Sequence, residues 1–157
     1  MAIWQVDFHV LPRRALPVTS EALSRALTDD TDWWADASFP LDYAKRLAAL
    51  APLARPWSAQ VETWGLEDGN RVDVSSRQGR VYRVTARVDV RRLDSKFGAA
   101  LIHFVRTVGA VLVRGDGLVV EPTINAYVGA LRSSDAWRFA SDPMTFLTSR
   151  MDSDDQP

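Results

Sequence analysis

Two stretches of the chain alternate between apolar and polar residues in the manner of half-buried strands. One runs from residue 3 to residue 11 and the other from residue 81 to residue 91. Side chains on a strand point alternately to its two faces, so each stretch predicts a strand with one buried and one solvated face. The positions predicted to point inward are Trp4, Val6, Phe8 and Val10 in the first stretch and Tyr82, Val84, Ala86, Val88 and Val90 in the second.

Helical spacing follows the second of these strands. Between residues 96 and 108 apolar residues recur every three or four positions, which predicts an amphipathic helix. Asp94 or Ser95 is placed to cap this helix and Gly109 to end it. Its predicted inward side is formed by Phe97, Ala100, Leu101, Phe104, Val105 and Val108. Shorter helices are predicted by the same reasoning over residues 21–27, 41–51, 123–131 and 144–148.

A predicted hairpin precedes the 81–91 strand. Residues 61–66 and 71–76 read as two short strands, and Asp68–Gly69 between them is a favoured two-residue turn with positive φ at both positions. After the predicted helix, residues 111–120 form either one strand or a second hairpin about Gly115–Asp116.

Gln78–Gly79 is the predicted turn from the 71–76 strand into the 81–91 strand, and it raises a conflict of register. A strict two-residue turn there places Val72 and Val74 on the face opposite Val84. Since a shift of one residue moves every side chain to the other face, a three-residue loop or a β-bulge is expected near this turn.

Together these elements predict an α+β fold of two layers. The sheet has about five or six mostly antiparallel strands, and helices pack on one of its faces. Alternating strands favour an antiparallel sheet, because strands covered on both faces are apolar throughout. At 157 residues the chain is long enough for one core, so residues 1–150 are predicted to form a single domain and residues 151–157 a disordered acidic tail.

Composition excludes several classes of function. The net charge of −1 supplies no global attraction to nucleic acid or to an anionic membrane, and with no cysteine there is no thiolate chemistry. The N-terminus lacks a signal peptide, and the most apolar stretch, residues 101–113, is too short to cross a bilayer. No cofactor-binding motif is present, so no cofactor is expected. Seventeen arginines against two lysines suggest a GC-rich bacterial genome, and we expect a cytoplasmic protein.

Arginine is concentrated in one part of the chain and acid in another. Residues 71–92 contain seven arginines and two aspartates, whereas residues 19–42 contain six acidic residues and one arginine. Guanidinium groups suit carboxylates, so the basic stretch either meets an acidic partner or folds against the acidic segment near residues 29–36. The partner is favoured, because a sheet face without helices is available for contact. The outward positions of the 81–91 strand hold no exposed aromatic residue, which disfavours RNA.

Two functions from different classes are compatible with these residues. The first is a non-enzymatic binding module whose candidate contacts are Arg71, Arg83, Arg87, Arg91, Asp7 and His9, with an acidic protein as its partner. Immunity proteins, which neutralise toxins, share this size and fold class, although no motif carries a closer resemblance. The alternative is a small hydrolase or metal-dependent enzyme that uses Asp7 and His9, with Asp73 or Asp89 in support.

Overall fold

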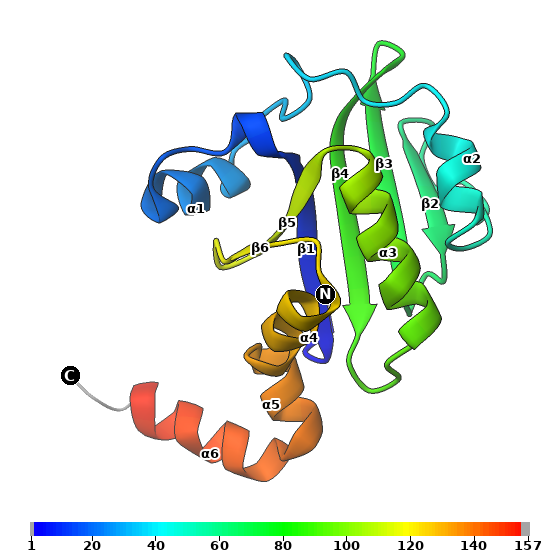
Figure 1. Ribbon diagram of the computed structural model, residues 1–157. Helices are drawn as coiled ribbons and strands as arrows, with labels where there is room; N and C mark the ends of the chain where they lie inside the picture. The colour runs from blue at the N-terminus through cyan, green and yellow to red at the C-terminus, as the bar shows by residue number, and fades with distance from the viewer. Residues whose placement is uncertain (1, 155–157) are drawn as a thin grey trace.

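The protein is built on one open antiparallel sheet, as the computed structural model of residues 2–154 shows (Figure 1). Within these residues the sheet has six strands in the order β2-β3-β4-β1-β5-β6. The strands are β1 (Gln5–Pro12), β2 (Val61–Gly65), β3 (Arg71–Arg77), β4 (Arg80–Asp89), β5 (Ala110–Arg114) and β6 (Val119–Val120). The predicted fold class, α+β with a mostly antiparallel sheet and helices on one face, is confirmed.

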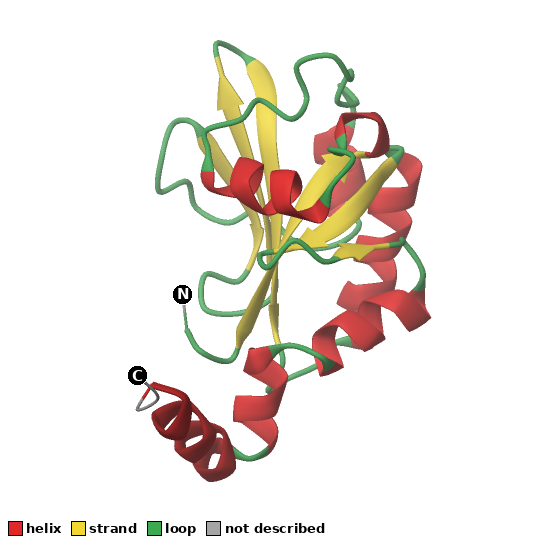
Figure 2. Ribbon diagram, turned by 90° about the vertical axis from the view of Figure 1, so that its left-hand side faces the viewer, coloured by secondary structure: helices red, strands yellow, loops and turns green. Residues whose placement is uncertain are grey.

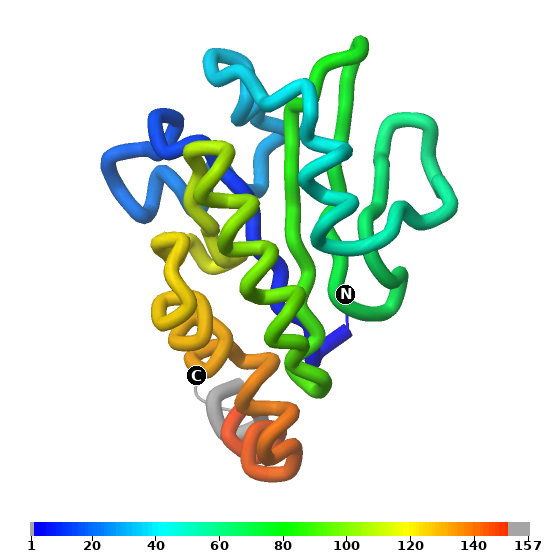
Figure 3. The backbone as a smooth tube through the Cα atoms, turned by 45° about the vertical axis from the view of Figure 1, so that its right-hand side comes forward, coloured from blue at the N-terminus to red at the C-terminus, as the bar shows by residue number. Residues whose placement is uncertain are grey.

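Six α-helices accompany the sheet within the same residues. They are α1 (Ser20–Thr28), α2 (Tyr43–Ala48), α3 (Ser95–Thr107), α4 (Ile124–Arg132), α5 (Asp135–Ser141) and α6 (Pro143–Asp154), and a single 3-10 turn spans Arg13–Ala15. Figure 3 shows α3 running along the sheet with α2 on one side of it and α4 on the other. In Figure 2 these helices lie on one side of the edge-on sheet, and α5 and α6 extend away beyond its end.

The helix-covered face of the sheet forms the centre of the core. Val84, Ala86 and Val88 of β4 are no more than 1% exposed. They share this face with Phe8 of β1, which lies directly opposite Ala86. Leu101 of α3 is also fully buried. The two alternating stretches therefore bury most of the apolar positions that the sequence pattern predicts to point inward; Trp4 is half-buried, and Tyr82 is an exception.

Helix α3 begins and ends within one residue of the predicted bounds, with the predicted cap at Asp94. The Asp94 carboxylate accepts hydrogen bonds from the backbone N–H groups of Lys96 and Phe97, which have no partner inside the helix. Gly109 follows the helix with φ +67°, a left-handed conformation in which a side chain is strained. The cap and the glycine thus fix the length of the helix that covers β4.

The β3–β4 hairpin contains the expected β-bulge, and the bulge reverses the direction of one aromatic residue. Gln78 and Gly79 form a tight turn with φ of 53° and 75°, and the register then shifts between Ser75 and Ser76. The prediction that Tyr82 points into the core is wrong. Val81 is buried instead, because the bulge changes the alternation before it resumes at Val84.

Two further local predictions are wrong. The Asp68–Gly69 turn does not have positive φ at both positions; Gly69 donates instead to the carbonyl of Leu66 in a longer connection. The helix predicted over residues 41–51 is reduced to α2, and Leu41, expected inside, is fully exposed, because the helix begins only after Asp42.

The C-terminal part of the chain is more helical than the sequence pattern indicates. Residues 111–120 form a hairpin, β5–β6, one of the two predicted alternatives. The brief helix predicted at residues 144–148 is the first part of α6, whose backbone continues to Asp154. The predicted tail begins inside this helix, and residues 155–157 lie outside the described residues.

Candidate functional site

The face of the sheet opposite α2 and α3 carries a connected set of polar side chains, which we call the polar sheet face. Two rows cross the strands. One runs from Thr63 through Asp73 and Thr85 to His9, and the other joins Arg71, Arg87 and Asp7. Residues directly opposite on neighbouring strands share a face, so each row is a line of adjacent side chains. The polar sheet face consists of Asp7, His9, Thr63, Arg71, Asp73, Arg83, Thr85 and Arg87.

The polar sheet face is not open along its whole length. Toward β5 the same side of the sheet is apolar and buried at Leu11, Val111 and Val113. Helix α1 lies at that edge, where the Ser24 hydroxyl donates to the carbonyl of Asp116. The open part is therefore limited to β3, β4 and the first half of β1.

Arg87 and Asp7 form the central ion pair of this face. Arg87 Nε lies 2.8 Å from Asp7 Oδ1, and a second guanidinium nitrogen lies 3.4 Å from Oδ2. The hydrogen bond with Asp7 raises the pKa of the Arg87 guanidinium against the opposing effect of burial. The sequence placed both residues on one face, and the structure brings their charges together.

A chain of hydrogen bonds crosses β3 and β2 and ends at an exposed tryptophan. Arg71 Nε donates to Asp73 Oδ2 (3.0 Å), and the Thr63 hydroxyl donates to Asp73 Oδ1 (2.6 Å). The indole N–H of Trp57 donates to the same hydroxyl (3.2 Å). Trp57 is nevertheless 66% exposed, so its ring is oriented by a bonded network while most of its surface faces solvent.

His9 lies on the polar sheet face but is not paired with Asp7. Burial, and secondarily the positive charge of Arg83, lower the pKa of His9 below 6.5, so the imidazole is neutral at pH 7. Its Nδ1 is buried and has no hydrogen-bond partner among the described residues. The Asp7 carboxylate is held by Arg87, and no carboxylate of the described residues hydrogen-bonds the imidazole to orient it as a catalytic base.

Arg83 belongs to a second group of arginines at the end of the β3–β4 hairpin. Its guanidinium donates to the carbonyl of Asp29 (3.1 Å) and lies 3.6 Å from the Asp30 carboxylate. Arg77 pairs with Asp30 at 2.6 Å, and Arg80 pairs with Asp32 at 2.7 Å. The acidic segment thus folds against this end of the basic stretch, one of the two arrangements that the charge pattern allows.

Arg91 does not continue the row formed by Arg83 and Arg87. Strand β4 ends at Asp89, and Arg91 lies in the turn that follows it. There its guanidinium pairs with Asp89 at 2.6 Å and stacks 4.1 Å above the ring of Trp4. The hydrogen bond from Arg91 lowers the pKa of the Asp89 carboxyl. Arg91 therefore closes the end of the sheet, and Asp89 is engaged there rather than beside His9.

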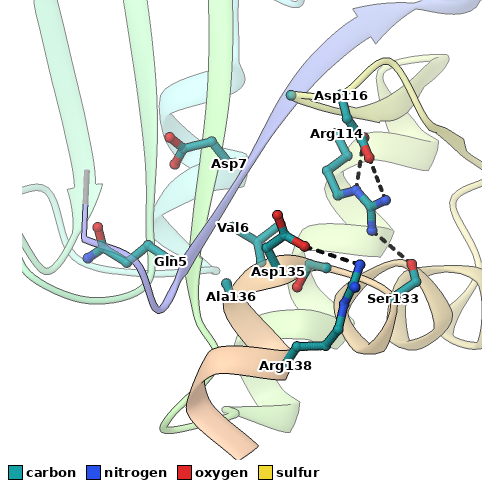
Figure 4. Close-up of a pocket in the computed structure, with 11 residues that line it drawn as sticks. Gln5, Val6, Asp7, Arg114, Asp116, Ser133, Asp135, Ala136 and Arg138 are labelled. Atoms are coloured by element: carbon teal, nitrogen blue, oxygen red, sulfur yellow. Dashed lines mark hydrogen bonds and ion pairs between the residues drawn. The ribbon is translucent and has the colours of Figure 1, made fainter. Parts of the chain in front are cut away.

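A pocket of about 330 Å³ adjoins the polar sheet face between β1, the β5–β6 turn and the start of α5 (Figure 4). Arg114 forms one wall and donates to Asp116 through two nitrogens and to Ser133 through a third. The Asp7 carboxylate points away from this wall, toward β4. Each charged side chain that lines the pocket already has an ion-pair partner, so among residues 2–154 no set of free charged groups converges there on a ligand.

The sequence reasoning missed two features of the site. Tryptophans in irregular connections either cover the edge of the core or form a contact patch, and the sequence does not say which role Trp57 has. Trp33 and Trp34 are buried, whereas Trp57 is exposed at the margin of the polar sheet face. Its position after Pro56 in an irregular connection gave no periodicity from which its exposure could be read. Thr63 was also missed, because nothing in the short strand between Glu62 and Trp64 distinguishes it from an ordinary strand residue.

Neither comparison with known proteins nor a search of the structure for membrane-spanning helices and metal sites assigns a function. The chain has no significant match among protein-family models, curated proteins or solved structures. No helix among residues 2–154 combines the length and the apolar character needed to cross a membrane. Within the described part of the chain, no three metal-ligating side chains of histidine, aspartate or glutamate are grouped as a metal site.

Proposed function

We propose that this protein is a non-catalytic binding module that engages a protein partner through the polar sheet face and Trp57. The observation that carries the proposal is the orientation of Trp57. A large aromatic ring is kept largely exposed while its N–H is bonded into the Thr63–Asp73–Arg71 network. A side chain that only covered the core would bury its ring, as Trp34 does.

The residue types around Trp57 support an interface. Tryptophan and arginine are the residues that most often dominate binding energy when they lie near the centre of a contact. Arg71 and Asp73 are only 14% and 16% exposed at their side chains, so the network under Trp57 is largely fixed before a partner arrives. A group that is already ordered loses less conformational entropy on binding, which favours affinity.

The enzymatic alternative has less support from the geometry. A hydrolase needs a base, an orienting group and a reacting group within hydrogen-bond reach of one another. His9 is neutral and so able to accept a proton, but Asp7 is bonded to Arg87 and Asp73 is bonded to Arg71 and Thr63. These carboxylates serve the ion pairs of the sheet.

We further propose that the module acts in the bacterial cytoplasm and neutralises its partner by occupying a surface, as an immunity or inhibitor protein does. Seventeen arginines against two lysines support a bacterial origin, and the absence of cysteine from the sequence is compatible with a reducing compartment. The rigid, paired surface supports an inhibitor, because inhibitor interfaces change little in shape on binding.

Trp57→Ala tests the proposed function, with Met144→Ala as its control. Both side chains are largely exposed, Met144 at 73%, and Met144 lies on α6 away from the sheet. Proteins that the wild-type chain captures from the native cell are purified. Their affinities for the wild type, for Trp57→Ala and for Met144→Ala are then measured by titration calorimetry. We expect Trp57→Ala to lower the affinity for the specific partner at least tenfold, a loss of about 1.4 kcal/mol, and Met144→Ala to leave the affinity unchanged. Equal affinities of wild type and Trp57→Ala would contradict the proposal.

A further inference from the structure

Three arginines gather at the end of the β3–β4 hairpin, and two of them lie against one aromatic ring. The Arg77 guanidinium lies 4.5 Å from the centre of the Tyr82 ring and that of Arg83 lies 5.8 Å from it. Arg80 follows the turn directly. The β-bulge places Tyr82 on this side of the hairpin, and stacking on its ring limits the orientations that the two guanidinium groups adopt.

These arginines already hold an acidic segment, which belongs to the chain itself. Asp30 binds Arg77 and lies near Arg83, while Asp32 binds Arg80, so carboxylates two residues apart meet neighbouring guanidinium groups. The segment connects the end of α1 to Trp33 without regular structure. The site therefore recognises a short acidic segment with carboxylates at alternate positions.

The internal contact is open to competition. The Arg77–Asp30 side chains are 53% and 62% exposed, and exposed ion pairs of this kind contribute little to stability and are screened by salt. Leu27 and Trp33 are buried on either side of the segment. The Asp30 carboxylate can thus leave Arg77 by rotation of its own side chain, while the buried residues stay in place. The Asp32 side chain is 29% exposed and its Oδ1 also accepts from the backbone N–H of Trp34 (3.2 Å), so its departure from Arg80 also disturbs that bond.

We propose that Arg77, Arg80 and Arg83 form a docking site for an acidic segment of the protein partner, and that residues 29–32 are the competitor that occupies it in the free protein. The inference rests on the proposed function, since it names the chemistry of the partner at the margin of the polar sheet face. The segment binds with carboxylates two residues apart and displaces Asp30 and Asp32. Its affinity is reduced by the fraction of molecules in which the internal segment is bound.

The test removes the competitor and leaves the arginines intact. The double variant Asp30→Asn with Asp32→Asn is compared with a variant that carries Glu21→Gln and Glu121→Gln. The control loses the same two charges, and its carboxylates also pair with exposed arginines, Arg25 and Arg13, away from the hairpin. The probe is a synthetic peptide, Thr-Asp-Asp-Thr-Asp-Trp, with an asparagine-for-aspartate peptide as its counterpart, titrated at low salt with NMR detection of arginine side-chain signals.

We expect the Asp30/Asp32 variant to bind the acidic peptide about tenfold more tightly than wild type, since a tethered competitor acts at a high effective concentration. Changes in chemical shift should be confined to the side-chain signals of Arg77, Arg80 and Arg83, and the asparagine peptide should not bind. Equal affinities in the Asp30/Asp32 variant and the Glu21/Glu121 control, or shifts spread over other arginines, would overturn the inference. The peptide titration involves no partner, so its failure leaves the Trp57 experiment as a separate test of the proposed function.

Discussion

The two faces of β4 differ in what they bury and in what they leave to a partner. On one face Val84, Ala86 and Val88 are excluded from solvent under the helices. On the other, Arg83 and Arg87 remain partly exposed; Arg87 pairs with Asp7, and Arg83 donates to the Asp29 carbonyl and lies near the Asp30 carboxylate. The first face is held by the hydrophobic effect, which is proportional to the apolar area buried. The second is held by directional pairs, which fix positions but contribute less free energy.

Strand β4 can therefore contribute to stability through one face and to recognition through the other. Apolar packing tolerates few changes of volume, because interiors are close-packed. The polar face keeps its side chains ordered through neighbours such as Asp7 and Asp73, and it still presents Trp57 to solvent. Changes on the first face should therefore alter the free energy of unfolding, and changes on the second should alter binding.

The largest loss of stability is expected from Phe104→Ala on α3. Phe104 is 2% exposed and lies in the core, so its removal should lower the free energy of unfolding by about 3–5 kcal/mol. Arg106→Ala, on the opposite side of α3, should change it by no more than about 0.5 kcal/mol. Urea melts of both variants check this, and similar losses in the two would show that the helix faces the sheet differently.

A smaller loss is expected when the central ion pair of the polar face is broken. Asp7→Ala leaves the half-buried Arg87 guanidinium without its carboxylate, which should cost about 1–2 kcal/mol. Adding Arg87→Ala should recover part of this loss, because no charge is then left unpaired. A double-mutant cycle measured by urea melts gives the coupling. A coupling energy of zero would mean that the pair does not order this face.

The next effect is a dependence of stability on pH through His9. Its folded pKa lies below the ordinary 6.5, so the unfolded chain takes up the proton more readily. The stability contributed by the neutral imidazole is complete above pH 6.5, decreases as the pH falls from 6.5 to the lowered folded pKa, and changes no further below it. Burial is the main cause of the lowered pKa of His9; the charge of Arg83 lowers it further, and the charge of Asp7 raises it.

NMR titration of the His9 ring measures this shift directly, and the midpoint should lie below 6.5. His9→Asn should remove the corresponding part of the pH dependence seen in urea melts. A midpoint at or above 6.5 would show that the imidazole is not desolvated on this face.

The smallest effect on stability is expected from Trp57→Phe. The substitution keeps an aromatic ring but removes the N–H that bonds Thr63, at a site that is mostly solvated. The free energy of unfolding, followed by thermal melts, should change by no more than about 0.5 kcal/mol. Partner affinity should still fall, because the ring is no longer oriented. A melting temperature well below that of the wild type would show that Trp57 contributes to the stability of the fold as a core residue does.

The core of the fold was predictable from the sequence because it depends on local periodicity. Alternation identified β1 and β4, and the conflict of register at Gln78–Gly79 correctly indicated a bulge. The direction of Tyr82 was not predictable, since the position of a bulge depends on tertiary packing. For the site, the charge pattern indicated that acidic and basic segments can meet, but only the register of the sheet shows that Arg87 pairs with Asp7 and Arg71 with Asp73.

The proposed function requires that the partner bind the polar sheet face and not the helical face. Hydroxyl-radical footprinting of the free protein and of its complex with the captured partner tests this at individual side chains. Trp57 and Met144 are both exposed and reactive in the free protein. We expect Trp57 and Tyr82 to lose reactivity in the complex, and Met144 and the exposed His103 of α3 to keep theirs. Protection of His103 with unchanged oxidation of Trp57 would contradict it.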